Sequence, residues 1–281
     1  MGVESQGDAK ASTELDFLLE KVYEDAGFDF RNHRRNMVVR RLERRVAALC
    51  LESLAEYSRF LDRHPEEYRK LVEYLTIKVS GFCRCPQTFE QLARLVLPEM
   101  VAYKKSRGER ALKFWSAACA RGEETYSIAI LLDQYLGDNK SDFDVAVYGS
   151  DISHKVLGAA REGIYFAEDI NGFPEEMRRR FFTQHGKGYL VTPDIRKLVD
   201  FAHFDLTSAA PLPVKNPDGI FCCNVLIYWQ RELQAEVLGR LCEALATPGY
   251  LVLGEVETPT PNVAHRLVCL DNKAKIYKKV R

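Results

Sequence analysis

Hydrophobic residues recur at helical spacing through the first part of the chain. Thr13 and Asp16 form a start typical of a helix cap, and Gly27 ends the first such segment. One face of that segment carries Leu15, Leu18, Leu19 and Val22. Three later stretches show the same pattern: residues 31–51, 54–62 and 67–79. The sequence therefore predicts a flexible tail over residues 1–12 and a helical N-terminal domain over residues 13–85.

Short apolar runs alternate with helical stretches in the rest of the chain. The predicted strands cover residues 112–117, 145–149, 199–203, 219–223, 250–253, 267–269 and 276–278. The predicted helices between them cover residues 126–136, 155–161, 175–180 and 231–245. This alternation indicates an α/β fold with a doubly wound, mostly parallel sheet. We expect a linker helix over residues 86–110, the sheet domain over 111–281, and a small antiparallel insertion near 184–200, around the turn-and-strand piece GKGYLVTP.

Composition narrows the functional classes only a little. The formal net charge is zero, which gives no whole-chain reason to expect nucleic acid or membrane as a partner. No apolar run approaches the roughly 20 residues that span a bilayer, and the polar start lacks a signal peptide. Most of the eight cysteines lie in apolar runs, and none has zinc-site spacing. We expect a cytoplasmic protein with reduced thiols, no bound metal and no membrane insertion.

Arginines crowd one of the predicted N-terminal helices. One helical face carries Arg34, Arg40, Arg41, Arg44 and Arg45, opposite an apolar face that includes Val39 and Leu42. A run of charges is often only a solvated surface. Lysine is nearly absent here, however, and arginine favours bidentate contacts to carboxylate or phosphate. An anionic partner is therefore the second interpretation, as either a nucleic acid or an acidic protein helix.

The stretch FWSAACARGEETYS joins the first predicted strand to a helix. It stands where dinucleotide-binding proteins carry G-x-G-x-x-G, but Gly122 is its only glycine. Two carboxylates at that place would repel a pyrophosphate, and they would attract a ligand with a positive centre. S-adenosylmethionine carries both an ammonium and a sulfonium group. We expect Glu124 to contact such a cofactor, whereas Glu123 can simply favour the helix start.

Polar residues also follow the later strands. Asp151 and Asp205 stand after the second and third strands, where ribose hydroxyls and the adenine edge are usually bound. Asn224 ends the fourth strand, and Tyr228 follows it in GIFCCNVLIYW. Arg84 stands in the otherwise apolar run VSGFCRCPQTF. Each of these residues also has a structural interpretation, as a cap, a turn, an ion pair or an aromatic packing residue.

Together these pieces resemble the CheR-type chemotaxis methyltransferases, in which methyl groups pass from S-adenosylmethionine to glutamate side chains on chemoreceptors. The matching stretches are LTIKVSGFCRCPQTF, FWSAACARGEETYSIAILL, YGSDISHKVLGAAREGIY, RRFF, GYLVTPDIRKLVDFAHFDL, IFCCNVLIYW and PGYLVLGEVET. They occur in family order over nearly the whole chain. The resemblance implies a Rossmann-like methyltransferase domain, a protein-glutamate O-methyltransferase activity and S-adenosylhomocysteine as the cofactor product.

The resemblance also assigns residues by position. The implied cofactor contacts are Lys78, Ser80, Arg84, Glu124, Asp151, Asp205, Leu206, Cys223 and Asn224. We expect Arg84 to orient the substrate carboxylate and Tyr228 to donate a hydrogen bond near it. The family's basic N-terminal helix is thought to engage the acidic helical cytoplasmic region of chemoreceptors, which would be the partner of Arg34, Arg40, Arg41, Arg44 and Arg45.

The chain also departs from the family pattern. Lys78 stands for an Asn, Cys223 for an Arg, and residues 255–257 (Glu-Val-Glu) for a His-Ser-Glu run. The turn around residues 186–188 is shorter than in members that bind a receptor-tail peptide by strand addition, so we expect no tethering through a pentapeptide tail. The alternative function is a catalytically weak or inactive cofactor-binding module that signals through a protein partner. The glycine pattern does not support a nicotinamide dehydrogenase. The sequence also lacks the Asn/Asp-Pro-Pro-aromatic run of nucleic-acid methyltransferases, which argues against that function.

Overall fold

The computed structural model describes residues 6–76 and 78–280. Contacts between residues divide the chain into two compact units. The first unit consists of the helical N-terminal residues up to 76 together with the segment Tyr228–Leu233. The second unit consists of residues 78–227 and 234–280 and contains the sheets. A late segment of the chain therefore belongs to the helical unit, which the hydrophobic pattern did not indicate.

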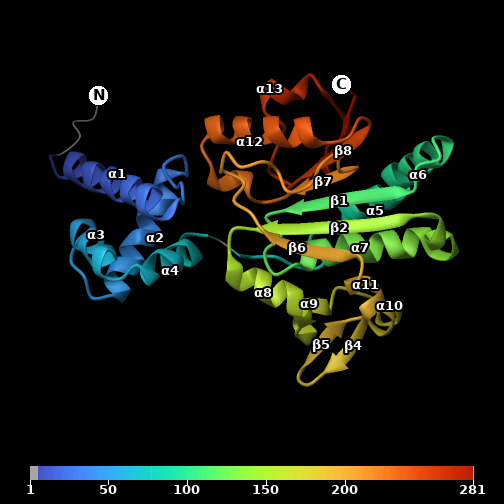
Figure 1. The fold of residues 1–281 in the computed structure, drawn as a ribbon, viewed down its shortest axis with the longest axis horizontal. Helices are drawn as coiled ribbons and strands as arrows, with labels where there is room; N and C mark the ends of the chain where they lie inside the picture. Colours follow the sequence, from blue (N-terminus) through green and yellow to red (C-terminus); the bar gives the residue numbers. More distant parts are fainter. Residues whose placement is uncertain (1–5, 77, 281) are drawn as a thin grey trace. The chain divides into compact units, whose positions relative to one another are not determined.

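The helical unit contains α1 (Gln6–Ala26), α2 (Arg35–Ala48), α3 (Leu54–Arg63) and α4 (Glu66–Leu75), drawn in blue to teal in Figure 1. Its core includes Leu18, Val38, Leu61 and Leu71, all fully buried. The predicted tail of residues 1–12 differs from the structure, because α1 already begins at Gln6. Alanine and lysine in this stretch favour helix, so α1 extends beyond its apolar face. Residues 1–5 lie outside the described residues.

Helix α2 begins four residues later than the apolar spacing predicts. Two residues before the helix, His33 pairs with Trp229 in an isolated antiparallel bridge, and the Arg34 N–H donates to the carbonyl of Tyr228 at 2.9 Å. These contacts use the backbone of the turn outside the helix. The buried face of α2 carries Val38, Leu42 and Val46. Val39, which the helical wheel placed on that face, is only half-buried.

The large sheet of the second unit has the strand order β6-β2-β1-β7-β8-β10-β9. Its strands are β1 (Ala111–Ala117), β2 (Asp144–Asp151), β6 (Val199–His203), β7 (Gly219–Cys222), β8 (Gly249–Leu253), β9 (Leu267–Asp271) and β10 (Ile276–Lys279). The first five strands pair in parallel, and β10 pairs antiparallel with β8 and β9. This order confirms the predicted doubly wound fold. The chain reverses direction of winding between β1 and β7, and ligands bind at the carboxyl ends of strands at such a point.

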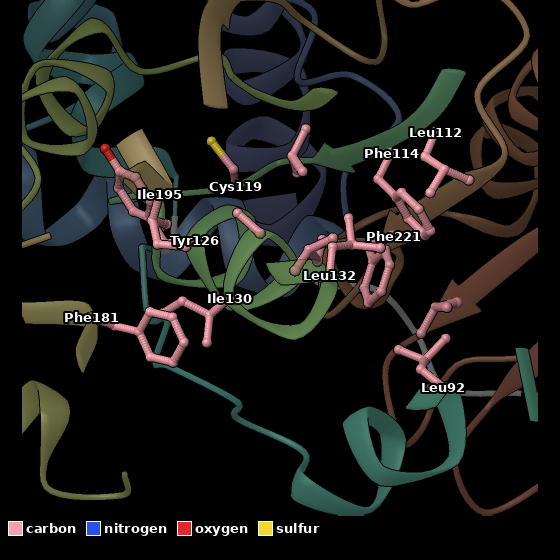
Figure 2. Packing of buried hydrophobic residues seen from close by; sticks show 14 of the residues in the cluster. Leu92, Leu112, Phe114, Cys119, Tyr126, Ile130, Leu132, Phe181, Ile195 and Phe221 are labelled. Atoms are coloured by element: carbon pink, nitrogen blue, oxygen red, sulfur yellow. The ribbon is translucent and has the colours of Figure 1, made fainter. Parts of the chain in front are cut away.

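Helices α7 (Glu123–Leu136) and α8 (His154–Glu162) follow β1 and β2 and pack on the sheet. The main core lies beneath them, and Figure 2 shows some of its members, among them Phe114 of β1, Phe221 of β7 and Leu132 of α7. The strand side chains of β8 are buried along its full length, as expected for a sheet covered on both faces. Helix α12 (Arg231–Ala244) precedes β8, and α13 (Pro261–Ala264) precedes β9.

The predicted linker helix over residues 86–110 is part of the second unit. It forms α5 (Pro86–Gln91), the π-helical turn η1 (Leu92–Val96) and α6 (Leu97–Ser106), and Leu92, Val96 and Met100 belong to the main core. The compact units also divide the chain at residue 77, not at the predicted boundary of 85. The physical reason is that the Cys83 N–H donates to Ser127 Oγ at 2.9 Å, which ties this segment to α7.

The small antiparallel sheet has the order β3-β5-β4, from β3 (Ile164–Tyr165), β5 (Gly188–Val191) and β4 (Phe182–His185). The prediction placed it near residues 184–200, but it begins at residue 164, and residues 199–203 form β6 of the large sheet. Figure 1 shows β4 and β5 beside α10, apart from β1 and β2. The remaining short elements are η2 (Gly137–Asp142), α9 (Ala167–Ile170), α10 (Glu175–Phe181), α11 (Pro193–Arg196) and η3 (Leu226–Tyr228).

Candidate active site

The loop from β1 to α7 has the backbone of a glycine-rich loop with few glycines. Ala118, Ala120 and Gly122 all have left-handed φ angles, of 66°, 49° and 87°. Such a conformation costs an alanine roughly 1–2 kcal/mol, so surrounding contacts must hold it. Only Gly122 is sterically required, because a Cβ there would lie 2.9 Å from both Ala160 Cβ and Phe201 Cζ.

Asp151 is one of the groups that hold this loop. Its carboxylate accepts the Ala120 N–H at 2.9 Å and the Ser153 N–H at 2.9 Å, and its side chain is buried. Burial raises its pKa, and these backbone hydrogen bonds and the charge of Lys78 act against that rise. Burial in turn lowers the pKa of Lys78 to about 8. Asp151 and Lys78, both predicted to contact the cofactor, therefore lie close together at the end of β2.

Glu124 lies in the first turn of α7. The Ser116 hydroxyl donates to its Oε1 at 2.6 Å, and the Cys223 thiol also hydrogen-bonds to the carboxylate. Burial raises the pKa of Glu124 to about 7, while these hydrogen bonds and the positive charge of Arg84 act in the opposite direction. At neutral pH the carboxyl group is thus close to its titration midpoint. A cationic group placed against it would favour the ionised form.

Glu123, the other acid of the loop, has a structural partner. Arg121 donates from Nε to Glu123 Oε1 at 3.0 Å and from its terminal nitrogen to Asp169 Oδ2 at 2.8 Å. Ser80, predicted to contact the cofactor, lies near Glu123 and acts against the rise in pKa that burial causes at this carboxyl. The positive charge of Arg121 is therefore compensated within the fold. Its presence in the loop does not oppose binding of a cationic ligand.

Glu257 is a buried acid whose importance the sequence interpretation missed. It accepts the N–H groups of Gly254 at 2.7 Å, Leu226 at 2.8 Å and Asn224 at 2.9 Å. These contacts fix the turns after β7 and β8, including the left-handed backbone of Asn224 at φ 59°. The only signal in the sequence was an acid three residues beyond a strand-ending glycine. The neighbouring Cys223 lies between Glu124 and the carbonyl of Val252, and burial raises the pKa of its thiol far above the ordinary value.

Arg84 is exposed, and its guanidinium donates to the carbonyl of Val79 at 3.0 Å. Its charge acts on the carboxyl of Glu124 and on the thiol of Cys85. Cys85 also hydrogen-bonds to Glu255, and burial raises the pKa of the thiol to about 11. Arg84 is therefore an exposed cation close to the Glu124 end of the loop, where an anionic substrate group could meet it.

Asp205 and Leu206 follow β6 in a tight turn. The Thr207 backbone N–H and hydroxyl donate to Asp205 Oδ1 at 2.8 and 2.7 Å, and Leu206 is buried. Next to this turn the imidazoles of His154 and His203 stack with their centroids 4.0 Å apart. The sequence interpretation did not single out these histidines. They follow β2 and end β6, so they lie at the edge of the sheet that carries Asp151.

The remaining predicted residues belong to the helical unit. Tyr228 is held there through its carbonyl by the Arg34 N–H. The five arginines of α2 and its start divide into two groups. Arg41 donates to the carbonyl of Tyr74, and Arg45 forms a bidentate pair with the buried Glu67 at 2.6 and 2.8 Å.

The second group consists of Arg34, Arg40 and Arg44. These side chains are exposed, and none forms an ion pair within residues 6–76 or 78–280. Arg41 and Arg45 thus stabilise the packing of α2 on α4, whereas these three remain available to a partner.

Comparison with protein families identifies the chain at the level of both units. Residues 13–76 match the model of the CheR methyltransferase all-alpha domain, and residues 78–275 match that of the CheR methyltransferase SAM-binding domain. The chain belongs to the CheR methyltransferase family. It is 35% identical over 243 residues to chemotaxis protein methyltransferase 2 of Pseudomonas aeruginosa, covering 85% of this chain and 84% of that protein.

Two further relatives carry similar names. The chemotaxis protein methyltransferase of Escherichia coli is 33% identical over 247 residues, with 85% of this chain and 82% of that protein covered. The protein of that name from Borreliella burgdorferi is 27% identical over 248 residues, with 87% and 88% covered. The two family models confirm the recognised family and S-adenosylmethionine as cofactor, and the strand order of the large sheet agrees with the expected Rossmann-like fold.

The residues of this CheR family member fit that cofactor. The β1–α7 loop carries no uncompensated cation, and the Glu124 carboxyl ionises near neutral pH, as a site for an ammonium or sulfonium group requires. The left-handed loop lets the backbone approach a ligand closely without a phosphate-binding glycine run. Among the helices in the described part of the chain, none has the length and apolar character needed to cross a membrane.

Proposed function

We propose that the chain transfers a methyl group from S-adenosylmethionine to glutamate carboxylates of chemoreceptors and produces glutamate methyl esters for sensory adaptation. The main support is the exposed guanidinium of Arg84 close to Glu124, at the edge of the sheet that binds the cofactor. A planar, permanently charged guanidinium suits a carboxylate acceptor. The names of the relatives point to the same process, since they are chemotaxis protein methyltransferases.

The cofactor supplies an electrophilic methyl group on a sulfonium. A glutamate carboxylate is already ionised at neutral pH, so the protein needs no strong general base. Its task is to orient the carboxylate and to remove water from it, and positioning alone can supply up to about 7–11 kcal/mol. Arg84 binds and orients the carboxylate, and the hydroxyl of Tyr228 donates a hydrogen bond near it.

The cofactor contacts belong to the proposal as well. Glu124 binds a cationic group of the cofactor, and Asp151 can accept ribose hydroxyls with lone pairs that its two backbone donors leave open. The further proposed contacts are Lys78, Ser80, Asp205, Leu206, Cys223 and Asn224. Lys78 and Cys223 line the part of the site that departs from the family pattern, and they tune cofactor affinity.

The exposed arginines Arg34, Arg40 and Arg44 form the surface for the partner, which we propose is the acidic helical cytoplasmic region of a chemoreceptor. Carboxylates repeated along a helix would meet guanidinium groups repeated along α2. Arg41 and Arg45 support this surface from below through Tyr74 and Glu67. We further propose that the protein acts in the cytoplasm, without a nucleic-acid substrate and without tethering through a receptor-tail pentapeptide.

The decisive experiment compares Arg84→Ala and Arg84→Lys with the wild type. Transfer of a labelled methyl group to a receptor fragment is measured, and cofactor binding is measured by calorimetry. Removing one donor to a reacting group costs about 100-fold or more in turnover, so Arg84→Ala should lose transfer far more than cofactor affinity. Arg84→Lys keeps the positive charge without the planar guanidinium, so its turnover should lie between those of Arg84→Ala and the wild type.

Unchanged turnover in Arg84→Ala would contradict the role of Arg84. A wild-type protein that binds the cofactor tightly but transfers no methyl group to any receptor would support the alternative function, a cofactor-binding signalling module.

A further inference from the structure

Two short segments far apart in the chain pair with each other inside the helical unit. Residues 32–34 precede α2, and residues 228–230 follow Asn224 by a few positions. The Arg34 N–H donates to the Tyr228 carbonyl at 2.9 Å, and the Gln230 N–H donates to the Asn32 carbonyl at 2.9 Å. We call this pair of segments the clasp. Its hydrogen bonds enclose His33 and Trp229, which form an antiparallel bridge.

The side chains of the clasp add a specific bond. The indole Nε1–H of Trp229 donates to Nε2 of His33 at 3.1 Å, and the two rings meet edge to face at 83°. Trp229 is only 4% exposed. Burial lowers the pKa of His33 to about 4, so the imidazole is neutral at physiological pH and its Nε2 can accept the bond. A phenylalanine at position 229 could fill the same space but could not donate to His33.

The clasp anchors Tyr228 within the helical unit. It holds the Tyr228 carbonyl and, two residues later, the Gln230 N–H. Trp229, between these two residues, is fixed by its own bond to His33. The clasp therefore restricts the Tyr228 backbone, and the turn that makes these bonds also starts the arginine-bearing helix α2.

We propose that the clasp positions Tyr228 for methyl transfer, with His33 and Trp229 as positioning residues, and that it links occupancy of the arginine surface to the catalytic step. This inference rests on the proposed function. Arg34 takes part in both events: its exposed side chain belongs to the partner surface, and its backbone N–H holds Tyr228. A receptor helix that binds at the start of α2 therefore contacts Arg34, the residue whose N–H fixes the Tyr228 carbonyl.

The test uses Trp229→Phe and His33→Gln in the full chain. Losing one buried hydrogen bond is worth about 0.5–1.5 kcal/mol, so kcat should fall roughly two- to tenfold in Trp229→Phe. The KM for a receptor fragment and the Kd for S-adenosylmethionine should stay as in the wild type. The matched control is Tyr68→Phe, which removes a hydroxyl bond to Asp25 elsewhere in the helical unit and should lower stability without lowering kcat.

A double-mutant cycle with Tyr228→Phe separates positioning from general destabilisation. If the clasp acts through Tyr228, adding Trp229→Phe to Tyr228→Phe should cost no further kcat. If the double variant instead loses kcat by the product of the two single losses, the clasp acts independently of Tyr228. This result would overturn the proposal. Wild-type kcat in both single clasp variants would overturn it as well, while leaving the proposed function intact.

The link to the partner surface has a spectroscopic readout. The chain has only two tryptophans, Trp115 and Trp229, so 5-fluorotryptophan labelling gives two ¹⁹F resonances that Trp229→Phe assigns. An acidic helical receptor fragment should shift the Trp229 resonance and leave that of Trp115 unchanged, and Arg34→Glu with Arg40→Glu should abolish the shift. Binding of the fragment without a Trp229 shift would contradict the link. A wild-type protein that methylates no receptor fragment would overturn the proposed function, and this inference with it.

Discussion

The helical unit and the cofactor edge of the sheet unit both gather charge on a chain that is neutral as a whole, but they hold their charges differently. Glu257 is buried and accepts the backbone N–H groups of Gly254, Leu226 and Asn224. In α2, Arg45 is held by a side chain of α4, while Arg40 and Arg44 reach solvent. Charges that the fold has already satisfied are structural. The functional candidates are those left exposed, such as Arg84, or left near their titration midpoint, such as Glu124.

The largest expected effect comes from a satisfied acid. Glu257→Gln keeps the shape of the side chain but points an amide NH₂ group at backbone donors. We expect the free energy of unfolding to fall by about 3 kcal/mol, since buried charged hydrogen bonds are costly to break. Chemical denaturation of the full chain, followed through the transition of the second unit, measures this free energy. An unfolding midpoint equal to that of the wild type would mean that Glu257 does not hold the turns after β7 and β8.

The next effect separates two neighbouring arginines. Arg45→Ala leaves Glu67 buried without its main partner and should lower the free energy of unfolding by about 2 kcal/mol. Arg44→Ala removes an exposed side chain and should change it by no more than about 0.5 kcal/mol. Denaturation of both variants under the same conditions tests whether the five arginines divide into a structural group and an exposed group. Equal losses in the two variants would contradict it.

The fold could be predicted from the sequence because its strands and helices carry regular apolar patterns. The strand over residues 199–203 has the predicted bounds, and the alternation of strands and helices was enough for a doubly wound sheet. The division of the five arginines into two groups could not be predicted, because a helical wheel does not show that Glu67 of α4 faces Arg45. The role of Glu257 and the pairing of Trp229 with His33 likewise depend on contacts between residues far apart in the sequence. Local sequence patterns do not predict such contacts.

A smaller effect concerns the pH dependence of cofactor binding. The pKa of Glu124 is raised to about 7, so below that pH the carboxyl must lose a proton before it can pair with a cation. Affinity for S-adenosylmethionine should therefore fall by up to about tenfold per pH unit below 7 and level off above it. Calorimetry in buffers of different ionisation enthalpy should detect proton release on binding near pH 6.5.

Glu124→Gln is the matched control for this profile. It removes the titrating group and should give a weaker affinity without that pH dependence. It should not lower the stability of the free protein, because a charge that burial disfavours has been replaced by a neutral group. A wild-type affinity that is flat between pH 6 and pH 8 would remove Glu124 from the cofactor site.

The smallest expected effect lies at the exposed arginines. Arg40→Ala and Arg44→Ala should each raise the KM for a receptor fragment by a few fold, with wild-type cofactor affinity, because exposed ion pairs are worth about 0.2–1 kcal/mol. The increase should shrink as salt is added. A KM that stays unchanged at low salt in the double variant would show that this face of α2 does not meet the receptor.

Methyl transfer to a defined receptor fragment tests the proposed activity most directly. The wild-type protein is incubated with labelled S-adenosylmethionine and a helical receptor fragment, alongside a fragment whose candidate glutamates are replaced by alanine. We expect label on the first fragment only, and release of that label as methanol in mild base, as expected for a methyl ester. Cofactor binding without labelling of any receptor fragment, or a label that resists base, would contradict it.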